Sequence, residues 1–262
     1  MGAMAALHPQ YTLSGFFVGL LVGLTGVGGG SLMTPLLVLL FGIHPATAVG
    51  TDLLYAAATK SVGTAVHGWN RSVDWRVVGR LATGSAPTTL ATGAMLYWLG
   101  ATSGGSSRLI SLVLGFAVLT TAVLLLGRSW LLAQVGPHLP PEGPRRAREL
   151  TILTGALLGV LVTLSSVGAG ALGVTALFLL YPRMPVARIV GSDIAHAVPL
   201  TLLAGGMHWW AGSVDWTLLL SLLSGSLPGI VVGSVLATRV PDRFVRSALA
   251  CVLVVVGGRL VL

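Results

Sequence analysis

The stretch "LTGVGGGSLMTP", residues 24–35, interrupts a long apolar run with four glycines among the five residues 26–30. Each glycine inside a helix is destabilising by roughly 1 kcal/mol relative to alanine. The stretch therefore predicts a break, at which one helix ends and another begins within the same apolar run. The role of such a break depends on the solvent that surrounds it.

The composition indicates that this solvent is lipid. The chain has 262 residues, of which 54% are hydrophobic and only 8% are charged, and its mean hydropathy is +0.91. Soluble domains carry about 25% charged residues. Continuous apolar runs long enough to cross a bilayer recur along the chain, without the alternation of a membrane β-strand. We therefore expect an all-α polytopic membrane protein.

The charged residues and the single cysteine exclude several kinds of partner. The formal net charge is +8, but the basic residues lie at the ends of apolar segments, so we expect contact with membrane lipid and not with nucleic acid. Cys251 is the only cysteine, which rules out an internal disulfide and a cysteine-based metal site. We expect no metal and no cofactor. The first twelve residues hold no Lys or Arg, so they make a poor signal peptide.

The chain repeats itself with an offset of about 140 residues. "GFFVGLLVGLTGVGGGSL" from Gly15 returns as "GALLGVLVTLSSVGAGAL" from Gly155, and the segment that begins "VGTD" at Val49 returns as "VGSD" from Val190. The stretches "TGSAP" at 83–87 and "SGSLP" at 224–228 also match. The order of these matches predicts two homologous halves.

Each half is expected to hold one glycine-broken segment and three transmembrane helices. We assign residues 1–135 to the first repeat, 136–149 to a cytoplasmic linker and 150–262 to the second repeat. The expected segments of the first repeat are a broken segment at 12–42 and helices at 46–69, 76–99 and 108–132. Those of the second repeat are a broken segment at 150–182 and helices at 186–211, 216–238 and 243–262.

The distribution of arginine predicts the path of the broken segments. If each broken segment returns to the side from which it entered, twelve of the fourteen arginines lie on one side of the membrane. If each crosses once, eight arginines lie on one side and six on the other, which is no clear bias. Cytoplasmic loops are enriched in Lys and Arg, which favours the re-entrant hairpin. Each half then crosses three times, so the two repeats are inverted, and both termini are periplasmic. Inverted repeats with interrupted helices are typical of secondary transporters.

The glycine-rich tips of these hairpins are candidate anion sites. Beyond each tip a short helix begins, and its first N–H groups have no intrahelical partner and carry partial positive charge. The alternative is that the glycines serve only close helix packing. The candidate substrate-binding residues at the tips are Thr25, Gly28, Gly29, Gly30, Ser31, Ser165, Ser166, Gly168 and Gly170.

These residues resemble a known family. The stretch "GLTGVGGGSLMTPLL", its weaker repeat and the paired "VGTD/VGSD" and "GSxP" stretches are similar to the sulfite exporter TauE/SafE family of anion transporters, over about residues 12–262. The resemblance implies transport of sulfite, sulfoacetate or a related organosulfonate across the cytoplasmic membrane, commonly as export. The second copy departs from the pattern, with Ala169 for the middle glycine and Thr175 where the first copy has Pro35.

A few ionisable residues within the apolar segments complete the candidate site. Lys60, the only lysine, suits an anionic substrate, and its alternative role is snorkelling towards an interface. Asp52 and Asp193 follow Thr or Ser, which is typical of a helix cap, and their alternative role is coupling to protons or a cation. His67, His208 and His196 are further candidates for proton coupling, against hydrogen-bonded interfacial positions. Asp74 and Asp215 are expected to cap helices.

The sequence thus predicts a secondary transporter of a small oxyanion that works by alternating access. A passive anion channel on the same scaffold is the alternative, which proton movement together with the substrate would exclude. An enzyme finds little support, because the chain has no metal-ligand cluster, no HExxH motif and no GxSxG-like spacing at Ser31 or Ser165.

Overall fold

All described elements of the chain are α-helices. The computed structural model describes residues 8–25, 30–69, 71–98, 107–135, 144–168, 170–236 and 242–261. In these ranges the helices are α1 (Pro9–Thr25), α2 (Gly30–Phe41), α3 (Pro45–Trp69), α4 (Trp75–Trp98), α5 (Ser107–Val135), α6 (Pro144–Ser165), α7 (Ala171–Leu180), α8 (Val186–Trp210), α9 (Trp216–Leu236) and α10 (Asp242–Val261). The all-α class is therefore confirmed for the described residues.

Several of these helices suit a bilayer. By length and composition, three segments, one each in α6, α8 and α9, are able to cross a membrane. Tryptophans stand at helix ends with largely exposed side chains, as at Trp69, Trp98 and Trp210. Aromatic residues at helix ends are typical of the boundary between lipid and water.

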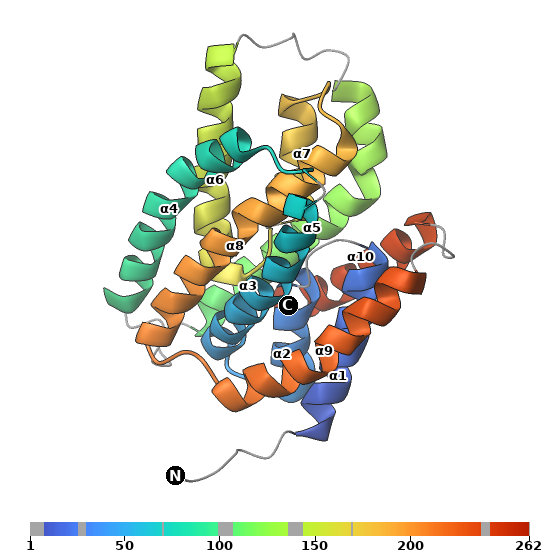
Figure 1. Ribbon diagram of the computed structural model, residues 1–262. Coiled ribbons are helices and arrows are strands. Elements are labelled where there is room, and N and C mark those ends of the chain that lie inside the picture. The colour runs from blue at the N-terminus through green and yellow to red at the C-terminus, as the bar shows by residue number, and fades with distance from the viewer. Residues whose placement is uncertain are drawn as a thin grey trace.

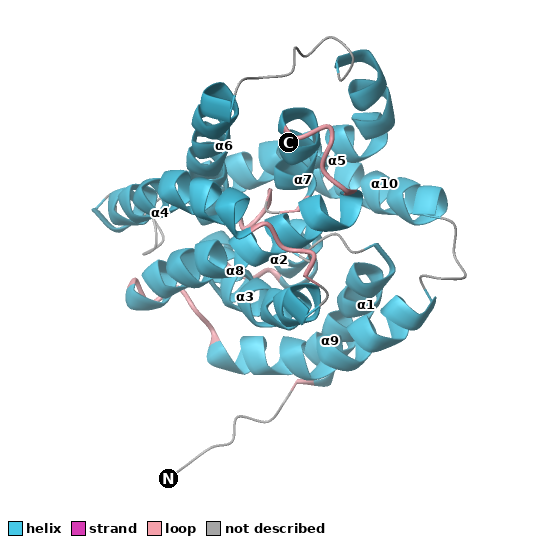
Figure 2. Cartoon of the chain, turned by 45° about the horizontal axis from the view of Figure 1, so that its top comes forward, coloured by secondary structure: helices cyan, strands magenta, loops and turns pink. Residues whose placement is uncertain are grey.

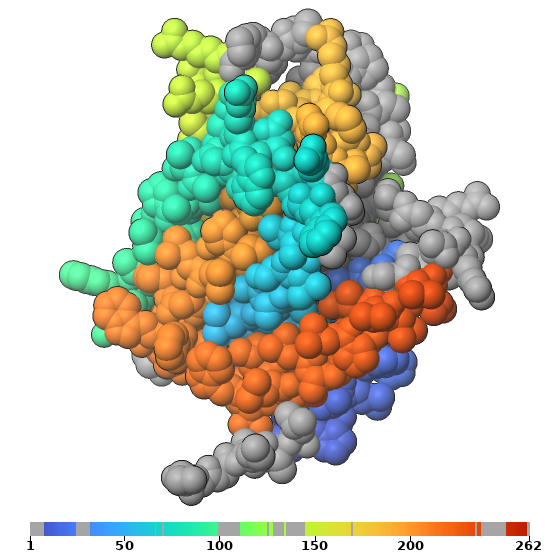
Figure 3. Space-filling view, viewed as in Figure 1, coloured from blue at the N-terminus to red at the C-terminus, as the bar shows by residue number. Residues whose placement is uncertain are grey.

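The helices pack in pairs that join the two halves of the sequence. α1 lies along α9, α4 along α6, α3 along α8, and α5 along α10 (Figures 1 and 2). Each pair takes one helix from the first half and one from the second. On the face drawn in Figure 3, α3 is visible between α8 and α9, so the central helices of both halves are interleaved.

Glycines bring two of these pairs into backbone contact. A Cβ added at Gly15 or Gly225 would collide with a backbone carbonyl oxygen across the α1–α9 contact. The same holds for Gly84 and Gly155 across the α4–α6 contact. Small residues that permit such close approach are common where helices associate in membranes. These four glycines therefore serve close helix packing.

Both broken segments fold back on themselves. At the open end of α1 and α2, the rings of Tyr11 and Phe41 lie in edge contact with centroids 4.9 Å apart. At the open end of α6 and α7, the hydroxyls of Thr151 and Tyr181 are hydrogen bonded at 2.7 Å. The start of the first helix therefore lies beside the end of the second helix in each case. We call α1 with α2 the first hairpin and α6 with α7 the second hairpin, and the two helices of each hairpin are its first and second arms.

One boundary differs from the expectation. α6 begins at Pro144, inside the range assigned to the linker, because "PRRARELT" continues as helix ahead of the apolar run. Arg145 and Glu149, four residues apart, form an exposed ion pair at 3.8 Å on this first part of α6. The division of the chain into two repeats and their inversion across the membrane stay predictions.

Candidate functional site

The first hairpin tip falls largely outside the described residues. Thr25 ends α1, and Gly30 and Ser31 begin α2, but only their backbones belong to the described part. Gly28 and Gly29 lie outside it. The structure thus places a helix start at Gly30, where the sequence predicted one, and the anion contacts expected at this tip stay predictions.

The second hairpin tip is a buried turn with unusual backbone angles. Ser166 has a φ of 57°, Gly168 of 120° and Gly170 of 130°. Angles in this range suit glycine, because a Cβ would clash with the backbone. The hydroxyl of Ser165 donates to the Leu161 carbonyl at 2.7 Å and accepts from the Val167 N–H at 3.2 Å, so its hydrogen bonds stabilise the turn itself.

Helix α7 starts from this turn without a side-chain cap. Gly170 is its N-cap residue and provides no side-chain hydrogen bond. The N–H of Gly173 donates to the Gly168 carbonyl at 3.3 Å, and that of Val174 to Gly170 at 3.0 Å. The N–H groups of Ala171 and Leu172 belong to the helix start, where intrahelical acceptors do not exist. The start of α7 therefore presents backbone donors and partial positive charge.

Asp52 and Asp193 do not cap their own helices. Each is the eighth residue of its helix, in α3 and α8, so it lies two turns beyond the helix start. The cap expected from "GTD" and "GSD" is therefore wrong. The neighbouring hydroxyls instead accept hydrogen bonds from the other half: Ser192 from the Asp74 N–H at 2.8 Å, and Thr51 from the Asp215 N–H at 3.1 Å.

Asp74 and Asp215 are helix caps as expected. A carboxylate oxygen of Asp74 accepts from the N–H of Arg76 at 3.0 Å at the start of α4. A carboxylate oxygen of Asp215 accepts from the N–H of Leu218 at 2.9 Å at the start of α9. The loop that carries Asp74 is thus held against Ser192, and the loop that carries Asp215 is held against Thr51.

The Asp52 carboxylate lies between the two hairpins. The hydroxyl of Thr34, on α2 of the first hairpin, donates a short hydrogen bond to one of its oxygens. The hydroxyl of Ser166, at the tip of the second hairpin, lies close to the same carboxylate. Neither this hydroxyl nor the other Asp52 oxygen completes a hydrogen bond with the described residues. Asp52 thus lies beside a residue of each hairpin and is hydrogen bonded to the one from the first.

The Asp193 carboxylate lies against the first turn of α7. A Cβ added at Gly173 would collide with one of its oxygens, so the absence of a side chain at Gly173 makes room for the carboxylate. Neither Asp193 oxygen has a hydrogen-bond donor among the described residues, and the side chain is only 1% exposed. A buried carboxyl group therefore lies at the positive end of α7.

Lys60 completes a buried group of three charged side chains. It is 7% exposed, and its electrostatic interaction with Asp193 is stronger than that with Asp52. Among the described residues, the buried side chains with a formal charge are these three alone. A long side chain that snorkels would hold its ammonium group in water. The burial of Lys60 disagrees with that alternative.

Two polar pairs flank this group at equivalent positions of the repeat. His196 Nε2 on α8 and the Ser85 hydroxyl on α4 are 2.9 Å apart. The Tyr55 hydroxyl on α3 lies near Ser226 on α9 without completing a hydrogen bond among the described residues. Sequence reasoning missed Ser85, Ser226, Tyr55 and Thr34 as site residues. The matched "GSxP" stretches were the signal that could have found the two serines.

The other two histidines lie at the far ends of α3 and α8. His67 Nδ1 and the Ser72 hydroxyl are 2.8 Å apart, and His67 is half-buried. His208 is buried, and its Nε2 lies 3.0 Å from the Thr163 carbonyl oxygen on α6. Both rings are thus hydrogen bonded to neighbouring groups, and the structure does not bring either to Asp52, Asp193 or Lys60 by any contact that it describes.

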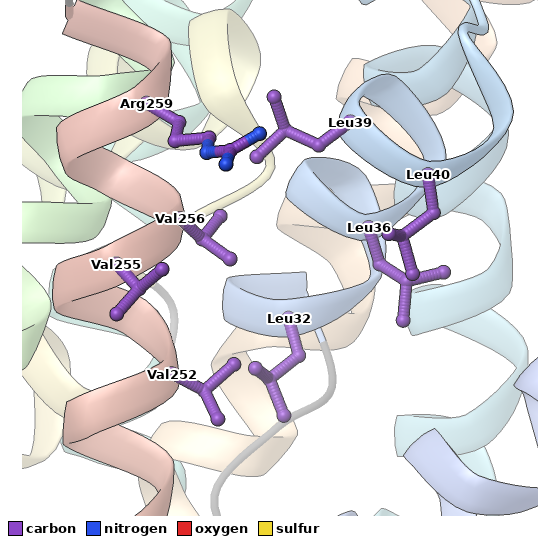
Figure 4. A pocket seen from close by; sticks show the side chains of 8 residues that line it. All are labelled: Leu32, Leu36, Leu39, Leu40, Val252, Val255, Val256 and Arg259. Atoms are coloured by element: carbon purple, nitrogen blue, oxygen red, sulfur yellow. The ribbon is translucent and has the colours of Figure 1, made fainter.

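An apolar groove on the outer surface is separate from the polar centre. It has a volume of about 310 Å³ and lies between α2 and α10, with Arg259 beside Leu39 (Figure 4). Its other walls are aliphatic, from residues such as Leu36 and Val256. Apart from Arg259, such walls offer no donors to a small oxyanion, and none of the candidate site residues that the structure describes lines this groove.

Known proteins match almost the full length of the chain. The family described as "Sulfite exporter TauE/SafE" matches residues 11–260. A "Probable membrane transporter protein YjnA" of Bacillus subtilis (strain 168) is 40% identical over 252 residues, which are 95% of this chain and 98% of that protein. A "Probable membrane transporter protein" of Xylella fastidiosa (strain 9a5c) is 30% identical over 86% of this chain and 83% of its own. No solved structure matches.

Proposed function

Because the chain belongs to the sulfite exporter TauE/SafE family of membrane transporters, we propose that it carries a small sulfur-containing oxyanion, such as sulfite or an organosulfonate, across the cytoplasmic membrane. The proposed direction is export. The observation that carries the proposal is the uncapped start of α7, which emerges from a buried glycine turn beside the charged centre of the molecule.

The proposed anion site uses backbone donors at the two hairpin tips. In the second tip, Gly168 and Gly170 supply the positive φ angles of the turn from which α7 starts, and the Ser166 hydroxyl would add a donor close by. The first tip would contribute Gly28, Gly29, Gly30 and Ser31 in the same way, with Thr25 at the end of the preceding arm. A helix start binds oxyanions through partial charge and N–H groups, without a basic side chain.

Lys60 is proposed to offset the charge of the bound anion. A charged group in a poorly hydrated interior is strongly destabilised unless a partner compensates it, at a cost of several kcal/mol. In the structure, the positive charge of Lys60 compensates the negative charges of the Asp193 and Asp52 carboxylates. An anion that enters the centre would draw on the same ammonium group, so its binding must be linked to the charges of the two carboxylates.

Alternating access is the proposed mode of transport. The folded-back ends of both hairpins, at Tyr11–Phe41 and Thr151–Tyr181, support re-entrant segments that reach towards the middle of the molecule from their own sides. In an inverted repeat these segments would enter from opposite faces. Rocking of one repeat against the other would then expose the tips to each face in turn.

A flux screen in liposomes tests this function. The purified chain would be reconstituted, and the uptake of sulfite, sulfate, thiosulfate, sulfoacetate and taurine compared with that of protein-free liposomes. We expect saturable flux of at least one sulfur oxyanion and stoichiometric movement of a coupling ion. Flux that does not saturate and moves no second ion would favour the channel, and no flux of any of these solutes would contradict the proposal.

A further inference from the structure

The Asp193 carboxylate occupies a place in which an anion is expected to bind. It lies against Gly173, the third residue of α7, at the end of the helix that carries partial positive charge. It is buried, and neither of its oxygens receives a hydrogen bond from the described residues. The Asp193 carboxylate and a substrate oxyanion would therefore compete for the partial positive charge at the start of α7.

Asp52 differs from Asp193 in its hydrogen bonds. It accepts the hydroxyl hydrogen of Thr34, which supports a negative charge on the carboxylate. Asp193 is held by electrostatics alone, from Lys60 and from the start of α7. Removal of the Asp193 charge therefore breaks no hydrogen bond to the described residues, whereas removal of the Asp52 charge weakens the one from Thr34.

The charges that face Asp193 can be counted from each neighbouring helix. α3 brings Lys60 and Asp52, and α8 itself brings His196, whose ring contacts Ser85 of α4. In their described residues α4, α6 and α7 contribute no buried side chain with a formal charge. With both carboxylates ionised the buried group therefore has a net charge of −1, from two acids and one base. A substrate anion would make this charge more negative, unless a positive charge enters with it.

We propose that Asp193 is a proton-binding site that couples anion binding to proton binding. This inference rests on the proposed function. A proton from the aqueous side adds to one Asp193 oxygen and forms a neutral carboxylic acid. The substrate anion then takes the positive end of α7 and shares the charge of Lys60. On the other side, release of the anion and of the proton restores the carboxylate, so that one proton moves with each anion.

The pH dependence of binding to the full-length protein in detergent tests this coupling. Methanesulfonate is a suitable probe, because its own charge is constant between about pH 5 and about pH 9. For the wild type we expect affinity to fall as pH rises, approaching tenfold per pH unit once Asp193 is ionised, since one proton enters with each anion. In Asp193→Asn the affinity should be nearly independent of pH and should match the acidic wild type.

A matched control and a direct proton count complete the experiment. Glu149→Gln makes the same change from acid to amide at an exposed residue, and it should keep the wild-type profile. Calorimetry of the wild type in buffers of different ionisation enthalpy should show uptake of one proton per anion at alkaline pH, whether or not Asp193→Asn folds. No uptake, or an unchanged pH profile in a folded Asp193→Asn, would overturn the inference. Absence of wild-type binding at every pH, both of methanesulfonate and of the five solutes of the flux screen, would instead contradict the proposed function.

Discussion

Lys60 and Asp193 come from different halves of the chain, and their interaction is the clearest sign that the centre of the molecule is built by both. Lys60 is buried on α3, and its strongest electrostatic partner lies on α8. The position equivalent to Lys60 in the second half is Thr201, whose hydroxyl donates to the Ala197 carbonyl at 2.8 Å. The charged centre is therefore asymmetric although the fold pairs equivalent helices.

Lys60→Gln tests this residue-scale account. The substitution leaves two buried carboxylates without their base, and removal of one partner from a buried ion pair typically destabilises a protein by about 3–5 kcal/mol. We expect a clear fall in the thermal unfolding temperature in detergent, and recovery of most of it in Lys60→Gln/Asp193→Asn, which restores the net charge of the centre. Equal unfolding temperatures of the single variant and the wild type would contradict the account.

The sequence predicted the ionisable residues of the centre, but not their contacts. Asp52, Asp193, Lys60 and His196 stood out because charged and titratable side chains are rare in apolar segments. Their partners could not be predicted, because they lie far away in the chain. Thr51 and Asp215 are 164 residues apart, and Ser85 and His196 are 111 apart. A local motif such as "GTD" therefore suggested a local cap, whereas tertiary packing assigns the hydroxyl to the other half.

At the scale of the helices, glycine contacts hold α1 against α9 and α4 against α6. The partners approach so closely that a methyl group would meet a backbone carbonyl of the opposite helix. The positions recur in the repeat, with Gly15 and Gly155 on the first hairpin arms and Gly84 and Gly225 on the helices that they contact. Each first arm is thus anchored to a helix of the other half through these glycines.

Gly225→Ala tests this anchoring. The added methyl group would collide with the Thr12 carbonyl and push α1 from α9, and such overpacking typically destabilises a protein by about 1–3 kcal/mol. Gly79→Ala on α4 is the matched control, because a Cβ there has nothing within 4 Å. We expect a lower unfolding temperature for Gly225→Ala and an equal or higher one for Gly79→Ala. The reverse order would show that the α1–α9 contact is not closely packed.

At the scale of the whole molecule, apolar runs and glycine breaks were enough to predict the all-helical class. They were enough because a bilayer requires each backbone group to be bonded within its own helix. The same patterns could not predict which helices pack together or that α6 begins at Pro144, inside a polar stretch. Those features depend on contacts between the halves and on charge pairs such as Arg145–Glu149.

The inverted topology predicts that the N-terminus and the linker lie on opposite sides of the membrane. Twelve of the fourteen arginines share one side only if both hairpins are re-entrant. With Cys251 replaced by serine, single cysteines placed before residue 8 and within 136–143 can be labelled with a membrane-impermeant thiol reagent in cells. We expect the cysteine at the N-terminus to be labelled from outside and the cysteine in the linker to be labelled only after permeabilisation. Labelling of both from the same side would contradict the inverted repeat.

The glycine tips are proposed to bind the anion through their backbone, and one pair of affinities tests this claim. The chain carries its own control, because Ala169 stands at the second tip where the first has Gly29. Gly29→Ala would place a methyl group in the space that the proposed anion needs, and it would cost a further penalty of about 1–2 kcal/mol if Gly29 has a positive φ. We predict that the folded fraction of Gly29→Ala binds the transported anion at least about tenfold more weakly, which corresponds to about 1.4 kcal/mol, while Ala169→Gly binds like the wild type. Unchanged affinity in a Gly29→Ala protein that is merely less stable would show that the tip glycines serve packing and would contradict the claim.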